Sequence, residues 1–403
     1  MPIFERISRW FASLRSDANV VTSPDVIAKS DTSFGVHVTN DAAMKLTAFY
    51  AGIRIRSENI ASFPKFVKKQ TPDGLVDASW HDAYKLINVR PNPYTNKFDF
   101  WNVVNTWLDG WGNSYALIER GSAGEPVALH QIHPSWVAGI AIVGGRKWYK
   151  VVSRDPRFSW LNGTHPDYNI LHFMLVTLDG IKGVNPVLYN AMALGKSYAT
   201  EKFASEFFEK GGNLRAVMET EGHFGDDDFR NFMRHFKASS NNYDTPLLEY
   251  GVKYKQLAID PIASALVQSE VLSIQDVCRI INIPPHMLAE LSHATFSNIE
   301  HQTIQFVQYS LRPTVKRIED ELEAKLFFDS ERDEFEVKFS LDGLLRGDTA
   351  ARSQFYHNAI LDGYMSRNEV RELEGLPHKE GLDDMLYPLN TGVVGKESEG
   401  PNE

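Results

Sequence analysis

The sequence is poor in the residues that most often carry redox or zinc chemistry. Among its 403 residues it has one cysteine, Cys278. A single cysteine excludes a disulfide framework within the chain and argues against a cysteine-based zinc site. Cys278 falls on an apolar helical face, whereas a catalytic thiol needs an electropositive, partly open setting. We therefore interpret Cys278 as a core residue.

Long hydrophobic runs are also lacking. No stretch approaches the ~18 apolar residues of a membrane span, and the longest candidate, 170–178, is short and contains His172. The first 15 residues have neither a continuous apolar region nor a small-residue cleavage site, so we expect no secretory signal. Their helical spacing of apolar side chains favours a short docking or frayed helix, with a membrane-surface or partner-binding helix as the alternative. These apolar residues are Ile3, Phe4, Ile7, Trp10, Phe11 and Leu14.

An excess of positive charge is missing as well. The chain has 42 basic and 52 acidic residues, which gives a net charge of −10 at pH 7. This sign is wrong for a protein whose whole surface binds nucleic acid. Segment 139–146 half-resembles a phosphate-binding loop, but it lacks the Lys and the Ser/Thr that hold phosphate and magnesium, so we interpret it as a hairpin turn. The sequence therefore predicts neither an ATPase nor a bound cofactor.

Convincing metal ligands are equally scarce. His130 and His133 are three residues apart, but in a strand-like stretch this spacing places them on opposite faces. The acidic run at 226–228 suits the N-terminus of a helix, where negative side chains are favourable. We therefore predict structural roles for these residues and no metal site.

What the chain does contain is typical of a globular α+β protein. Hydrophobic residues make up 43% and charged residues 23% of the sequence, both close to ordinary usage. At roughly 100–200 residues per domain, the length corresponds to two to four domains. Region 41–185 combines two predicted helices, capped by Asn40 and Thr95, with several strands. The predicted strands are 115–119, 127–132, 137–143 and 148–152.

Two long helices of matched length follow this mixed region. Asn185-Pro186 and Asp260-Pro261 each combine an N-cap residue with proline at the first helical position. Within segments 186–211 and 260–284, the predicted helices of about 25 and 23 residues span about 37 and 35 Å at ~1.5 Å per residue. Because they flank a small α/β insertion, 212–259, we expect an antiparallel pair with a module at its far end.

A third long helix is predicted from Ser297, where Ser297 and Glu300 form a capping box. Pro313 lies inside this helix and should bend its axis. A strand at 335–339 comes next.

Two short helices then follow, capped by Asp348 and Ser366 and separated by Gly363. A DNA-reading helix-turn-helix is one interpretation of this pair. However, residues 331–403 hold 16 acidic and 8 basic residues, so a peripheral helical cap is the better interpretation.

Several short motifs occur in order over about residues 40–390. They are Ala48–Pro64 (AFYAGIRIRSENIASFP), Arg90–Pro93 (RPNP), Gly112–Ala116 (GNSYA), Ile283–Leu288 (IPPHML), Thr295–Glu300 (TFSNIE), Tyr309–Pro313 (YSLRP), Asp342–Asp348 (DGLLRGD), Asn368–Arg371 (NEVR) and Glu374–Pro377 (EGLP). In this order they resemble the portal, or head-to-tail connector, protein of tailed double-stranded DNA bacteriophages, in the Hong Kong-type branch of long-tailed phages. The first 35 residues and the C-terminal tail lie outside the resemblance.

The resemblance implies a portal-like α+β fold with a fixed order of parts. These are a flexible N-terminal arm (1–40), an α+β wing (41–185), a first stem helix (186–211), an α/β clip (212–259), a second stem helix (260–284), a tunnel loop (285–297), a long kinked helix with a wing strand (298–344), a helical crown (345–390) and a flexible tail (391–403).

The resemblance also implies a structural role and no enzymatic one. Such subunits form a ring of twelve at one vertex of the virion capsid, which admits double-stranded DNA during packaging and releases it during ejection without reading its sequence. The implied partners are the terminase large subunit, which supplies the energy, the major capsid or scaffold protein, and a head-completion adaptor. The ring would nucleate the procapsid in the host bacterial cytoplasm, with no membrane contact.

Candidate functional residues then follow from the implied parts. The tunnel loop would bring five residues toward the channel, although Phe296 also fits a hydrophobic staple for the helix that begins at Ser297. Acids on the second stem helix would repel DNA phosphates and keep friction low, and basic clip residues would contact DNA or the motor. The tunnel-loop residues are His293, Ala294, Thr295, Phe296 and Ser297, the stem acids are Glu270 and Asp276, and the clip bases are Arg215, Lys253 and Lys255.

Two alternatives of other kinds remain. One is a different phage head or neck ring protein. The other is a soluble enzyme that uses the aromatic-rich α+β region as a cleft, with Asp109 and Glu119 as paired carboxylates. Oligomer size separates them, because an enzyme would be a monomer or small oligomer and a portal a large ring.

Overall fold

The computed structural model describes residues 37–72, 74–209, 216–220, 222, 225–241, 252–256, 260–291, 302–341, 349–374 and 376–386. The chain divides into two compact units, Met1–Lys338 and Phe339–Glu403. The predicted tunnel-loop residues 293–297, the C-terminal tail and the first 36 residues of the predicted arm lie outside the described residues.

The first unit begins with two helices, where the sequence predicts one helix capped by Asn40. α2 (Asn40–Ala43) is capped by Thr39, whose side chain accepts a hydrogen bond from the Ala42 amide at 3.1 Å. α3 (Thr47–Ser62) follows after a short break. The prediction that Asn40 is the cap is therefore wrong by one residue.

The next long helix, α5 (Lys97–Trp111), begins at a different cap from the one predicted. Asn96, and not Thr95, accepts a hydrogen bond from the Asp99 amide at 2.8 Å. Trp101 and Leu108 are buried on this helix. Helix α5 packs against both α3 and strand β3, so it links the helical layer of the first unit to its sheets.

Within the described residues, the first unit has three three-stranded sheets and one two-stranded sheet, which belongs to the insertion 212–259. The strand orders of the three-stranded sheets are β11-β1-β2, β4-β3-β8 and β5-β6-β7. The predicted strands between residues 115 and 152 are confirmed with end shifts of at most two residues, and strand 335–339 is confirmed. The strands of the three-stranded sheets are β1 (Lys65–Thr71), β2 (Gly74–Asp77), β3 (Asn113–Arg120), β4 (Pro126–Ile132), β5 (Val137–Val143), β6 (Arg146–Val151), β7 (Gly163–Pro166), β8 (Ile170–Met174) and β11 (Phe335–Phe339).

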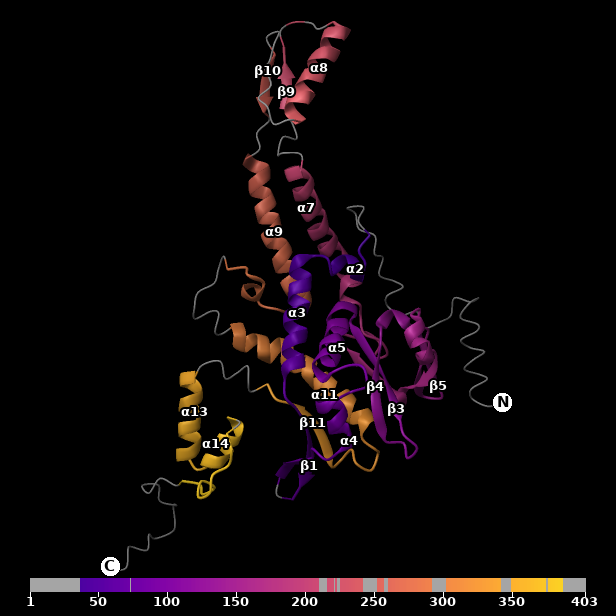
Figure 1. Ribbon diagram of the computed structural model, residues 1–403, viewed down its shortest axis with the longest axis vertical. Coiled ribbons are helices and arrows are strands. Elements are labelled where there is room, and N and C mark those ends of the chain that lie inside the picture. Colours follow the sequence, from indigo (N-terminus) through magenta and orange to yellow (C-terminus); the bar gives the residue numbers. More distant parts are fainter. Residues whose placement is uncertain are drawn as a thin grey trace, which may run out of the picture. The chain divides into compact units, whose positions relative to one another are not determined.

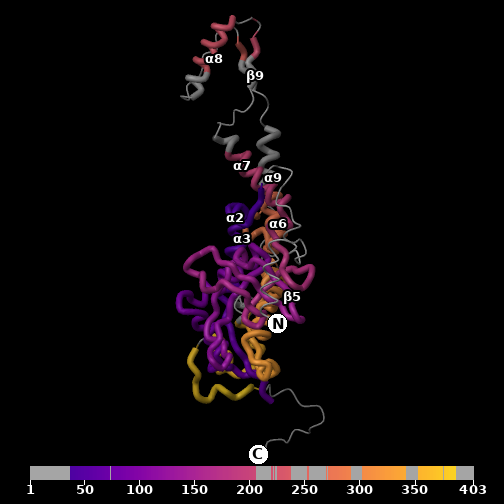
Figure 2. Tube along the Cα trace, turned by 90° about the vertical axis from the view of Figure 1, so that its right-hand side faces the viewer, coloured from indigo at the N-terminus to yellow at the C-terminus, as the bar shows by residue number. Residues whose placement is uncertain are grey.

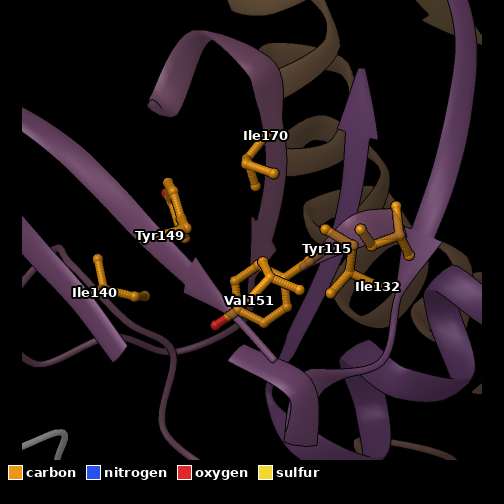
Figure 3. Packing of buried hydrophobic residues seen from close by; sticks show 7 residues of the cluster. Tyr115, Ile132, Ile140, Tyr149, Val151 and Ile170 are labelled. Carbon is orange, nitrogen blue, oxygen red and sulfur yellow. The ribbon is translucent and has the colours of Figure 1, made fainter. Parts of the chain in front are cut away.

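A hydrophobic core forms where the β4-β3-β8 and β5-β6-β7 sheets approach each other (Figure 3). Tyr115 and Ile132 contribute from the first of these sheets, and Ile140 and Tyr149 from the second. All four are less than a tenth exposed. Burying a large apolar side chain of this kind contributes about 1.5–3 kcal/mol, so this cluster holds the two sheets together.

Short elements connect the sheets and helices of this unit. They are α4 (Asp82–Tyr84), the π-helix η2 (Lys85–Val89), and the 3₁₀ helices η3 (Pro134–Trp136), η4 (Pro156–Leu161) and η5 (Asp167–Asn169).

The two long helices predicted from their start signals lie side by side (Figures 1 and 2). The first is divided at Asn190 into α6 (Pro186–Tyr189) and α7 (Ala191–Glu209), where the sequence predicts one continuous helix. The second is α9 (Asp260–Ile281). The Thr200 hydroxyl of α7 lies 3.4 Å from the Ser269 hydroxyl of α9. The N-terminal signal at Asn185 is confirmed, because Asn185 accepts hydrogen bonds from two backbone amides of α6. Helix α9 begins at Asp260 itself, so Asp260 is its first helical residue and not the predicted N-cap.

The chain between α7 and α9 contains a strand pair and a helix, as predicted for an α/β insertion. β9 (Ala216–Glu219) pairs antiparallel with β10 (Lys253–Gln256), and α8 (Asp226–Asn241) lies between them in sequence. After α9 come the 3₁₀ helix η6 (Pro285–Leu288), the π-helix η7 (Phe306–Leu311) and α11 (Arg312–Leu326). Pro313 therefore occupies the first turn of α11, directly after the wide π turn, where proline is well tolerated.

The second unit contains α13 (Thr349–Leu361) and α14 (Arg367–Leu373). The predicted capping box at the start of α14 is confirmed. The Ser366 side chain accepts from the Glu369 amide, and the Glu369 carboxylate accepts from the Ser366 amide. Gly363, with φ +73°, separates the two helices as predicted.

Candidate functional site

The predicted channel residues are only partly within the described structure. Residues His293, Ala294, Thr295, Phe296 and Ser297 lie outside it, and so does the side chain of Glu270 on α9. Asp276 is described and forms an ion pair with Arg279 at 2.6 Å, one helical turn away. Because this pair is close to neutral, Asp276 adds little net charge to this part of α9.

The two chain segments that flank the predicted tunnel loop are hydrogen-bonded to each other. The Asn282 side chain at the end of α9 donates to the Tyr309 carbonyl of η7 at 3.0 Å. The Ser310 hydroxyl donates to the Asn282 carbonyl at 2.5 Å. Asn282 has φ +53°, a left-handed conformation that asparagine tolerates better than most residues. These two hydrogen bonds hold the end of α9 next to η7.

Ser310 of η7 is also contacted by a buried arginine. The Arg56 guanidinium of α3 donates to both carboxylate oxygens of Asp109 on α5, at 2.9 and 3.1 Å. It also donates to the Thr314 hydroxyl at 3.1 Å and to the Ser310 hydroxyl. The side chains of Arg56 and Asp109 are each 4% exposed. This bidentate geometry is the strong form of a charge-assisted hydrogen bond, and it joins α3, α5, η7 and α11.

This arrangement corrects the interpretation of Asp109 and Glu119 as paired catalytic carboxylates. Asp109 is held by Arg56, whereas Glu119 is 57% exposed and lies 2.8 Å from His130 Nε2. The other ring nitrogen of His130 lies 3.0 Å from the Tyr94 hydroxyl. The two carboxylates thus belong to different networks. The Arg56 network was not predicted from the sequence, because its members lie far apart along the chain.

Metal and thiol chemistry find no support in the described part of the chain. Within those residues, no group of three His, Cys, Asp or Glu side chains could hold a metal ion. Cys278 is buried, and burial raises the pKa of its thiol to about 11. The thiol therefore stays protonated near neutral pH, as expected for the core residue that the sequence predicts.

A buried lysine, Lys65, begins strand β1 directly after α3. Lys65 is 2% exposed, and its ammonium donates to the Ala61 and Phe63 carbonyls at 2.9 and 2.8 Å. Burial, with a smaller contribution from Lys97, lowers the pKa of Lys65 to about 7. Its charge is therefore sensitive to pH in a range where ordinary lysines are fully protonated.

Two of the three predicted clip bases, Lys253 and Lys255, lie two residues apart on β10. Lys253 is exposed and lies directly opposite Glu219 of β9. Arg215 and the side chain of Lys255 lie outside the described residues. Opposite charges at a cross-strand position attract each other, so a phosphate would compete with Glu219 for Lys253.

Among the described helices, none is both long enough and apolar enough to cross a bilayer.

The arrangement of helices and small sheets recurs in a solved structure. A chain from the neck of a native gene transfer agent particle, computed with C12 symmetry, matches with a TM-score of 0.56. The match covers 92% of this chain and 99% of that chain at 15% identity. This likeness shows that the two chains share a fold.

Sequence comparison then defines the family. The model of the phage portal protein family matches residues 47–375, so this chain belongs to the phage portal protein family. A probable portal protein of Streptomyces phage phiC31 is 28% identical over 91% of this chain and 82% of its own length. The portal protein of Enterobacteria phage HK97 is 25% identical over 74% of this chain and 70% of its own length.

Proposed function

We propose that twelve copies of this chain form a ring at one capsid vertex of a tailed phage, through which double-stranded DNA enters during packaging and leaves during ejection. The observation that carries this proposal is the family match over residues 47–375. The fold supports it further, because a matching chain comes from a neck structure computed with C12 symmetry. The proposed role is structural, and the energy for translocation would come from the terminase large subunit.

The parts of the ring subunit follow from the elements. Residues 41–185 and β11 would form the wing, α6–α7 and α9 the stem, and β9, α8 and β10 the clip. Residues 285–297 would form the tunnel loop and residues 345–390 the crown. The side-by-side packing of α7 and α9 supports this division, because an inserted module between two such helices is carried at their shared end. The clip would contact the terminase and then the head-completion adaptor, and the ring would nucleate the capsid together with capsid or scaffold protein.

The proposed channel wall carries negative charge that would repel the passing DNA. Helix α9 carries Asp260, Glu270 and Asp276 against a single Arg279. If α9 lines the channel in every subunit, the wall repels DNA phosphates, and Asp276 adds little to this repulsion because it is paired with Arg279. The tunnel-loop residues 293–297 would contact DNA, and Arg215, Lys253 and Lys255 would contact DNA or the motor at the clip.

The ring is tested first by the mass of the purified protein. Light scattering should give about 550 kDa for twelve subunits of 45.6 kDa each, and negative-stain images should show particles with a central hole. A chain that stays monomeric or dimeric when concentrated, and also with added capsid and scaffold protein, would contradict the proposal.

The charge of the channel is tested separately by reversing it. Rings of Glu270→Lys/Asp276→Lys should package DNA more slowly than wild type, and the deficit should shrink at higher salt because salt screens the new attraction to phosphate. Glu380→Lys, an exposed acid of the second unit, is the matched control and should package normally. Packaging at the wild-type rate by the double variant would rule out the low-friction wall.

A further inference from the structure

A groove lies where α3, α7, α9 and η6 meet. It has a volume of about 550 Å³, within the range of protein sites that hold a ligand or side chains of a partner. Its lining is mainly apolar, with polar residues of α7 and the exposed Arg54 and Glu201 among the rest. The apolar lining includes Leu46, Ala51, Ile55, Ile274, Val277 and Leu288.

The described chain begins nine residues before Leu46, the first residue of the groove lining. The described residues begin at His37, and Val38 is already buried. Helix α2 follows, and Leu46, eight residues after Val38, lies in the groove wall. Figures 1 and 2 show α2 close to α3 and α7. The 36 residues that precede His37 are therefore tethered close to the groove.

Residues 1–15 contain apolar side chains that an apolar groove would bind. At about 100° per residue, the six apolar side chains between Ile3 and Leu14 gather on one helical face, and Arg9 lies opposite them. Large aromatic side chains, here Phe4, Trp10 and Phe11, bury the most apolar surface per residue. An apolar stripe of this kind needs a surface to cover it.

The tether has a suitable length. Residues 16–37 are a polar stretch of 22 residues, for which a flexible chain has a root-mean-square span of about 25 Å. Such a linker maintains an effective concentration on the order of 1 mM. A contact with a Kd of about 0.1 mM would then be occupied roughly ten times as often as it is empty.

We propose that residues 1–15 bind with their apolar face in the groove between α3, α7, α9 and η6 of the same subunit. The segment would cover the apolar ends of these helices at the junction of the wing and the proposed stem. The inference does not depend on the portal role, because it concerns a contact within one subunit.

The first test measures protection of the groove in the full-length chain. Ala51→Cys places a thiol in the groove, and its maleimide labelling should be about tenfold slower than when Trp10→Asp is added. Ser13→Asp adds the same charge off the apolar stripe and should leave the protection intact. Ile142→Cys, on a half-exposed position of β5, should label rapidly in all backgrounds. Native Cys278 can stay in place, because its burial should make it label far more slowly than Ile142→Cys.

Two results of this test would overturn the proposal. One is that Ala51→Cys labels as fast as Ile142→Cys with the N-terminal segment intact. The other is that protection persists in Trp10→Asp, since the groove would then be covered by something else, such as a neighbouring copy.

A crosslinking experiment tests whether the segment belongs to the same subunit. Arg15→Cys at the edge of the apolar stripe and Thr47→Cys at the groove should be joined by a short bismaleimide without a change in mass on a denaturing gel. Arg15→Cys with Ile142→Cys is the matched control and should not crosslink. A ladder of covalent dimers and higher species would overturn binding within one subunit and assign the groove to the segment of a neighbouring copy.

Discussion

The buried ion pair between Arg56 and Asp109 allows a quantitative test of how α3 and α5 hold the helix that follows the predicted tunnel loop. Arg56→Met removes the guanidinium and leaves the Asp109 carboxylate buried at 4% exposure without the cation that contacts it. Removing one partner of a buried pair costs about 3–5 kcal/mol, because the remaining charge is left uncompensated. The Ser310 and Thr314 hydroxyls keep acceptors at the Asn282 and Ser310 carbonyls. Most of the loss should therefore come from Asp109.

A double variant separates the charge effect from simple loss of packing. Arg56→Met/Asp109→Leu removes both charges and replaces them with apolar side chains, a change that is often neutral or stabilising at buried pairs. We expect the double variant to lie within about 1–2 kcal/mol of wild type, so that the two single substitutions are coupled by at least roughly 2 kcal/mol. The free energy of unfolding of wild type, Arg56→Met, Asp109→Leu and the double variant is measured in urea, because urea adds no ionic strength.

A surface pair serves as the control for this cycle. Lys85 and Asp82 are 2.9 Å apart, with side chains 62% and 54% exposed, and exposed pairs contribute about 0.2–1 kcal/mol. Lys85→Met should therefore cost under about 1 kcal/mol, and salt should weaken this effect but not the Arg56 effect. The uncompensated Asp109 charge would not be the cause if Arg56→Met lowered the free energy of unfolding as little as Lys85→Met does. The same would follow if the losses of the two single variants simply added in the double variant.

Three further predictions concern single positions. The pKa of Lys65 is about 7 in the fold against an ordinary 10.5, so the unfolded state binds more protons between these values, and the free energy of unfolding should rise there by up to about 1.4 kcal/mol per pH unit. Lys65→Met should remove this pH dependence when urea unfolding is compared at pH 7.5 and 9.5. Equal pH dependence in wild type and Lys65→Met would contradict the prediction. Gly112→Ala should lower the free energy of unfolding by more than about 2 kcal/mol, because Gly112 has φ +72° and a Cβ would lie 1.9 Å from the Val184 carbonyl oxygen. Gly145 has φ +77° but open space around a Cβ, so Gly145→Ala should lower it by only about 1–2 kcal/mol. Equal losses in urea unfolding would argue against the close approach at Gly112. Cys278, with a thiol pKa raised by burial to about 11 from an ordinary 9.0, should react at pH 8 about 100-fold more slowly in the native protein than in urea, and comparable rates would show that it is not buried.

Local signals in the sequence predicted most elements because their physics acts within a few residues. The Asn185-Pro186 start and the Ser366–Glu369 capping box lie where predicted. Which of two adjacent residues caps a helix was harder to predict. Asn40 is not the cap of α2, since its side chain accepts a hydrogen bond from the Asn185 amide group at 3.1 Å, 145 residues away.

Sequence by itself therefore determined the family, the α+β composition and the positions of the long helices, because ordered motifs, caps and hydrophobic periodicity are local properties. Only the tertiary structure showed that Arg56 joins Asp109 to residues more than 250 positions away. It also showed that Asp276 is neutralised by Arg279, and that four separate elements enclose an apolar groove. The physical reason is that hydrogen bonds and burial depend on distances in space, which the folded backbone sets and which no local pattern along the chain records.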